Sequence, residues 1–75
     1  MPITVPDLGS GRVAFSLWHA AAGDRVTEGD RVAELLLPGA VFDVPAPATG
    51  VLAERTAQPG DALGAGQVLG EIEEE

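Results

Sequence analysis

The segments "GDRVTEGDRVAEL" at residues 23–35 and "GDALGAGQVLGEI" at residues 60–72 are two copies of one pattern. The copies begin 37 residues apart, half the length of the chain, and share an opening Gly-Asp, a second glycine, two apolar positions and a glutamate. Chance alignment of glycine-rich sequence is the alternative explanation. A repeat at half length predicts two similar β units, each too small to bury its apolar face alone, packed together about an approximate two-fold axis.

The apolar residues outside the repeat support an all-β fold. Val, Ile, Leu and Phe occur in short runs separated by Gly and Pro, a pattern typical of many short strands joined by turns. We expect no helix and place strands at 3–5, 12–19, 30–37, 40–44, 50–57 and 67–72. Our core candidates are Phe15, Leu17, Val26, Val32, Val44, Val51, Leu52, Val68, Leu69 and Ile72.

Length and charge limit the classes of function. Seventy-five residues form one domain, 1–75, with a thin core, and we expect the acidic end at 73–75 to fray or to begin a linker. The net charge of -8 opposes binding to nucleic acid and to anionic membrane surfaces. The absence of cysteine excludes disulfides and thiolate chemistry. Because we find neither a signal peptide nor a long apolar segment, we expect a cytoplasmic protein.

Catalytic and metal-binding candidates are few. His19 is the only imidazole, and without a cysteine or a second histidine we expect no zinc site and no nucleophile-base pair around it. We therefore predict no catalytic residue and no metal ligand, and place His19 at the surface near a strand end. Trp18 is expected to be half-buried packing. The acidic side chains lack the spacing of a calcium loop and are expected to be solvated or to stabilise turns: Asp24, Glu28, Asp30 and Asp61.

Four segments resemble one known family. They are "VPDLG" at 5–9, "VAFSLWHAAAGDRVTEGDRVAEL" at 13–35, "DVPAPATGVL" at 43–52 and "PGDALGAGQVLGEI" at 59–72. In this order and spacing they resemble the lipoyl/biotinyl domain family, and most closely the lipoyl domains of 2-oxo acid dehydrogenase acyltransferases. The resemblance implies a flattened barrel of two four-stranded antiparallel sheets with quasi-two-fold symmetry, called a barrel-sandwich hybrid, in agreement with the repeat.

The resemblance also draws attention to a turn within "LLLPGAVFDVPAP" at 35–47. In the family this hairpin tip carries Asp-Lys-Ala, and the lysine amine bears lipoate or biotin. Counting back from the "VPAP" at 44–47, these three positions fall on Pro38, Gly39 and Ala40. The chain contains no lysine, and an arginine guanidinium stays protonated and is not a nucleophile. We therefore expect a degenerate attachment turn and no lipoate or biotin cofactor.

Apolar residues flank this turn on both sides. Three consecutive leucines at 35–37 cannot all face one way along a strand, so at least one should be exposed. An exposed apolar patch beside a prominent turn suggests a protein-docking surface, for which we name Leu36, Leu37, Val41 and Phe42. The alternative is a rearranged hairpin folded back on the rest of the domain.

Three functional hypotheses remain, and in none of them is this chain itself an enzyme. The first is a lysine-free binding or scaffold module that acts through its hairpin face. The second is a domain or subunit of a 2-oxo acid dehydrogenase acyltransferase whose transferase activity belongs to other domains. The third is a structural domain of the efflux-adaptor type, disfavoured because adaptors usually carry a long helical hairpin at this turn. Expected partners are 2-oxo acid dehydrogenase components or a lipoate/biotin ligase.

Overall fold

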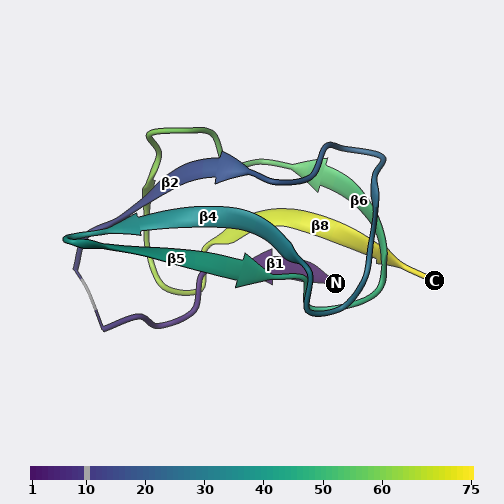
Figure 1. The fold of residues 1–75 in the computed structure, drawn as a ribbon, viewed down its shortest axis with the longest axis horizontal. Coiled ribbons are helices and arrows are strands. Elements are labelled where there is room, and N and C mark those ends of the chain that lie inside the picture. Colours follow the sequence, from purple (N-terminus) through teal and green to yellow (C-terminus); the bar gives the residue numbers. More distant parts are fainter. Residues whose placement is uncertain (10) are drawn as a thin grey trace.

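The computed structural model describes residues 1–9 and 11–75, and these fold into two antiparallel sheets of four strands each (Figure 1). One sheet has the strand order β1-β8-β6-β3 and the other has the order β5-β4-β2-β7. The strands are β1 (Pro2–Thr4), β2 (Val13–Trp18), β3 (Arg25–Val26), β4 (Arg31–Leu37), β5 (Ala40–Pro45), β6 (Gly50–Arg55), β7 (Ala62–Leu63) and β8 (Val68–Glu74).

The quasi-two-fold relation expected from the repeat is present in the strands. β2, β3 and β4 are followed 37 residues later by β6, β7 and β8, and the two sheet orders interchange when each strand is replaced by its counterpart. The turns repeat as well. Asp24 accepts a hydrogen bond from the Ala21 N–H, and Asp61 accepts the equivalent bond from Gln58, both at 2.9 Å. These aspartates therefore stabilise turns, as Asx motifs do.

The core lies between the two sheets and takes side chains from both. The inward positions alternate with outward ones along each strand, as the pleat requires. Among the described residues no charged or polar side chain is buried. The largest fully buried side chains are Phe15, Ile3, Leu35, Leu52, Leu69, Ile72 and Val32.

Two of the ten core candidates are wrong. Leu17 is 40% exposed and Val68 is 47% exposed. Leu17 follows a β-bulge between Phe15 and Leu17, which breaks the alternation from which its direction was predicted. Val68 directly precedes the fully buried Leu69, and successive side chains in a strand point to opposite faces. Val51, beside the buried Leu52, is only partly buried for the same reason.

The strand predictions found the six longer strands and missed two. β3 and β7 contain only two residues each and follow the Gly-Asp turns, where we predicted loop. The C-terminal end also differs from expectation. β8 continues to Glu74, and Glu75 forms a 2.7 Å ion pair with Arg25, so residues 73–75 lie against the domain. Whether a linker begins here stays a prediction.

Trp18 has the half-buried packing role expected of it. Its indole Nε1–H donates to the Ala57 carbonyl at 2.9 Å, and its ring centroid lies 5.2 Å from that of Phe15 at an interplanar angle of 45°. This tilted geometry is favourable for an aromatic pair, and the hydrogen bond satisfies the only polar atom of the indole. Trp18 thus closes one side of the core.

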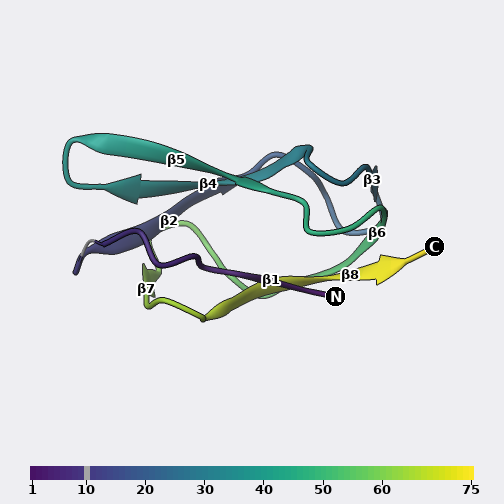
Figure 2. The ribbon, with the colours of Figure 1, turned by 90° about the horizontal axis from the view of Figure 1, so that it is seen from below.

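The molecule is elongated, and its two ends differ. Figure 2 shows the β4–β5 hairpin at one end of the long axis and both termini at the other. The extents along the principal axes are 35, 19 and 17 Å. The described part of the chain has no helix of the length and apolarity needed to span a bilayer. The hairpin is therefore the part of the domain farthest from the chain ends.

Leu69→Ala should lower the free energy of unfolding by about 2 to 5 kcal/mol, because the side chain is fully buried and its removal leaves a cavity. Urea unfolding followed by Trp18 fluorescence measures this change. Val68→Ala is the matched control and should cost below about 1 kcal/mol, the range of strand propensity at an exposed site. An equal decrease in the free energy of unfolding for the two variants would contradict the assignment of Leu69 to the inner face of β8 and Val68 to its outer face.

Candidate functional site

The β4–β5 hairpin closes with a two-residue turn. Leu37 and Ala40 are cross-strand partners, so that Pro38 and Gly39 occupy the two central positions. Gly39 has φ of 73°, close to the value of about 80° at the third position of a type II turn, where proline commonly precedes. No atom lies within 4 Å of a Cβ placed at Gly39. The backbone conformation at position 39 therefore favours glycine, whereas crowding by neighbouring atoms does not.

An apolar row crosses the outer face of the hairpin sheet. Val41 pairs with Leu36 across the hairpin, Leu36 pairs with Ala14 on β2, and Ala14 pairs with Ala62 on β7. Val41 is 58% exposed and Leu36 is 44% exposed. We call this surface, formed by Val41, Leu36, Ala14 and Ala62, the apolar row. Its presence meets the expectation that one of the three leucines would be exposed.

A shallow hollow adjoins the apolar row near the turn. Its volume is about 340 Å³, and Leu36, Pro38 and Ala62 lie on its wall together with Arg12 and Gly60. Hairpin tip, hollow and apolar row form one continuous surface. This surface contains most of the exposed apolar side chains of the hairpin sheet and is the candidate functional site.

The four docking residues predicted from the sequence do not share one face. Leu36 and Val41 lie on the outer face, whereas Leu37 and Phe42 are partly buried and pack against the core. Phe42 also contributes to a smaller hollow beside Val44 and β1 on the other side of the hairpin. Only two of the four predicted residues are therefore exposed on the outer face, and Ala14 and Ala62, which the sequence did not indicate, lie in the same row.

The hairpin tip offers no nucleophilic nitrogen. Pro38, Gly39 and Ala40 carry no polar side-chain atom, and the sequence has no lysine. The α-amino group of Met1 lies at the opposite end of the domain (Figure 2), where it donates to Glu71 Oε1 and to the Ile72 carbonyl, each at 2.9 Å. An acyl group cannot be joined to this turn through a side-chain amide.

A second group of polar side chains lies on the same outer face, farther from the turn. His19, Glu34 and Asp43 bring one ligand atom each within 4.8 Å of one another. From the sequence we expected no partner for His19, and we did not predict this cluster. The signal was present in the hairpin register, since Glu34 and Asp43 are equally distant from the Pro38-Gly39 turn and must pair across it.

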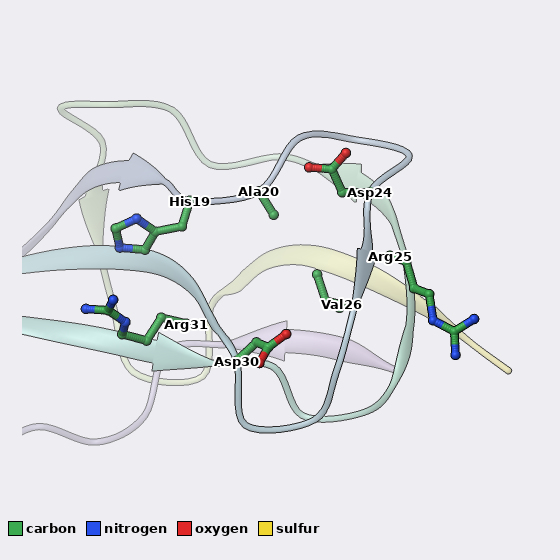
Figure 3. Close-up of a pocket in the computed structure, with 7 residues that line it drawn as sticks. All are labelled: His19, Ala20, Asp24, Arg25, Val26, Asp30 and Arg31. Carbon is green, nitrogen blue, oxygen red and sulfur yellow. The ribbon is translucent and has the colours of Figure 1, made fainter.

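His19 also borders an open hollow of about 570 Å³ that the sequence did not predict (Figure 3). Figure 3 shows the His19 ring and the Arg31 guanidinium on the same side of this hollow, while the Arg25 side chain points away from it. Asp24 and Asp30 also line the hollow, but their carboxylates accept backbone N–H bonds in the turns.

A family model described as "Biotin-requiring enzyme", of the biotin/lipoyl type, matches residues 1–72. The chain belongs to this biotin/lipoyl family. Among curated proteins, the lipoamide acyltransferase component of the branched-chain alpha-keto acid dehydrogenase complex is similar to it. The Pseudomonas aeruginosa protein is 33% identical over 97% of this chain, and the Bacillus subtilis protein is 32% identical over 97%.

The match covers only a part of those relatives. This biotin/lipoyl chain spans 18% of the length of each acyltransferase component. A solved structure of similar size agrees in fold: the lipoyl domain of the 2-oxoglutarate dehydrogenase complex from Azotobacter vinelandii has a TM-score of 0.75 and 25% identity, with 96% of both chains covered. The all-β arrangement of two four-stranded antiparallel sheets predicted from the resemblance is confirmed.

Gly39→Ala should destabilise the domain by about 1 to 2 kcal/mol, because a side chain at positive φ is strained even with open space around it. Gly64→Ala is the control. Its surroundings are equally open, but Gly64 is not among the glycines with positive φ, so its replacement should be neutral or slightly stabilising. Thermal unfolding of both variants measures the difference. A Gly39→Ala variant as stable as the wild type would contradict the type II turn.

Proposed function

We propose that this biotin/lipoyl chain carries neither lipoate nor biotin and acts, without catalysis of its own, as a binding or scaffold module that docks through the apolar row. The observation that carries the proposal is the hairpin tip: the turn consists of Pro38 and Gly39, and the sequence contains no lysine. Aligning the turn with the family motif by counting back from 44–47 puts Gly39 at the lysine position. The attachment turn is then degenerate.

The apolar row supports a docking role. Leu36 and Val41 are exposed on the two-strand hairpin at the end of the domain, beside a hollow that can receive a partner side chain. Large exposed apolar residues grouped around a concavity are typical of protein interfaces. The curated relatives are components of branched-chain alpha-keto acid dehydrogenase complexes, so a protein of such a complex is the proposed partner. A lipoate or biotin ligase is the second partner to test.

A second candidate function is that of a degenerate lipoyl-type domain within a longer acyltransferase component. The similarity to acyltransferase components, of which the chain spans 18%, favours this candidate. Intact mass spectrometry of the protein isolated from its host separates the two, because the mass gives both the length of the chain and any attached group. A mass equal to that of the 75 residues supports the scaffold module, and a longer chain supports the acyltransferase domain.

The chain should gain no mass when incubated with lipoate, ATP and a lipoate ligase, because it offers no side-chain amine. Gly39→Lys should be modified poorly, since the new lysine would be held at a φ of 73° beside Pro38. The double variant Pro38→Asp/Gly39→Lys should be modified better, because it restores both the aspartate and the lysine that the family motif Asp-Lys-Ala carries at this turn.

Intact mass spectrometry is again the measurement, and Arg55→Lys is the control that places a lysine on β6, away from the hairpin tip. Arg55→Lys should stay unmodified. A mass increase on the wild-type chain would show that another group accepts lipoate, and the proposed function would then be wrong.

Leu36→Ser and Val41→Ser should each weaken binding to the host's 2-oxo acid dehydrogenase component by about tenfold, the typical cost of truncating a central interface residue. The affinity is measured by NMR, from the chemical-shift changes of the ¹⁵N-labelled domain as the purified component is added. Val68→Ser is the matched control, because Val68 is 47% exposed but lies on β8 of the other sheet. Equal losses for Val68→Ser, or no binding by the wild-type chain, would contradict docking through the apolar row.

A further inference from the structure

Three side chains that can ligate a metal converge from three neighbouring segments of the hairpin sheet. His19 follows β2 directly, and its backbone N–H donates to the Val32 carbonyl at 2.8 Å, which fixes it beside β4. Glu34 on β4 pairs directly with Asp43 on β5. The three ligand atoms lie within 4.8 Å of one another, and His19 Nε2 is 3.7 Å from Asp43 Oδ1.

We propose that His19, Glu34 and Asp43 form a surface site for a divalent transition-metal ion, for which Zn²⁺ is the best-fitting probe. This site is independent of the proposed docking function. One imidazole nitrogen with two carboxylates is a donor set suited to zinc and its neighbours in the transition series, whereas Mg²⁺ and Ca²⁺ prefer oxygen ligands alone.

The distances suit such an ion after small side-chain movements. Bonds of about 2.0 to 2.1 Å in a tetrahedral site separate the ligand atoms by about 3.3 to 3.4 Å. The His19–Asp43 separation of 3.7 Å is close to this value, and the other separations, all within 4.8 Å, can shorten by rotation about side-chain bonds. The Glu34–Asp43 cross-strand pair and the hydrogen bond from His19 to Val32 hold the backbone at all three positions. Three protein ligands leave a fourth position for water.

The charges around the cluster favour a divalent cation. Carboxylates placed directly opposite one another on adjacent strands repel. Arg31 Nη1 approaches Asp43 Oδ2 only to 3.5 Å, and its side chain is 70% exposed, so it is a weak counterion that can be displaced. One divalent ion would neutralise Glu34 and Asp43 together, within a chain of net charge -8 that attracts cations.

Two further features support a metal site here: one ligand is already oriented, and the cluster is open to solvent. Ser16 Oγ donates to Glu34 Oε2 at 2.8 Å and so orients this carboxylate, as outer partners of metal ligands do. The His19 and Asp43 side chains are 34% and 39% exposed, so ions reach the cluster directly from solvent. His19 also borders the open hollow of about 570 Å³ (Figure 3).

The test is titration of the metal-free, untagged 75-residue chain with ZnCl₂ by isothermal titration calorimetry at pH 7.5. One equivalent should bind, and His19→Gln, Glu34→Gln and Asp43→Asn should each weaken binding by at least about tenfold, since even outer partners of metal ligands are worth that much. Glu54→Gln, on β6 of the other sheet, is the control and should bind as the wild type does. Arg31→Ala should bind about two- to fivefold more tightly, because a competing cation is removed.

A spectroscopic readout identifies the ligand directly. His19 is the only histidine, so its two imidazole carbon-bound protons are assigned without ambiguity by NMR and should shift on zinc addition but not on CaCl₂ addition. Urea unfolding confirms that each variant is folded, as expected for substitutions at partly exposed positions. No zinc binding, unshifted His19 signals, or equal affinity in wild type and His19→Gln would each overturn the proposal.

Discussion

The two sheets depend on one shared core. Every large, fully buried side chain of the described residues lies at the interface between the sheets, and a single four-stranded sheet of this size has nothing else against which to bury its apolar face. The side chains of the inner faces are therefore buried in the core and contribute to the stability of the fold. Binding functions are left to the outer faces, the edges and the two ends of the long axis.

The outer face of the hairpin sheet combines two kinds of surface within a few strand positions. Near the turn lies the apolar row, from Val41 and Leu36 to Ala14 and Ala62. Farther along the same strands, Glu34 and Asp43 form the next outward pair, with His19 beside them. The alternation of the strand sets this spacing, because Glu34 and Leu36 are two residues apart and so point the same way. The face changes from apolar to polar away from the tip.

Much of the fold could be predicted because the sequence contains the same pattern twice, at 23–35 and at 60–72. The half-length repeat predicts two equivalent units, and the two Gly-Asp pairs predict a tight turn in each of them. The strands β3 and β7 could not be found, since two residues show no periodicity. Leu17 was misplaced because a β-bulge depends on pairing between strands and leaves no mark in the local pattern.

The candidate site was predicted less completely than the fold. The turn could be deduced from the Pro38-Gly39 dipeptide, and the exposure of one leucine from the three consecutive leucines of the strand before it. Ala14 and Ala62 join the apolar row through pairing between strands distant in sequence, which no local rule supplies. Within the His19 cluster, Glu34 and Asp43 could be paired from the hairpin register, but the place of His19 beside them depends on the pairing of β2 with β4 and on its hydrogen bond to Val32.

The paired termini give the domain a second end equivalent to the hairpin. β1 lies beside β8 as β5 lies beside β4, and the Met1 amine contacts the Ile72 carbonyl, but no turn joins the two strands there. A linker of a few residues from Glu75 to Met1 would create that turn. Opening the chain at Pro38-Gly39 would then give a circular permutant with the same core and the same strand neighbours. The position of the break between these two-fold related strands thus decides which end of the domain carries the hairpin turn.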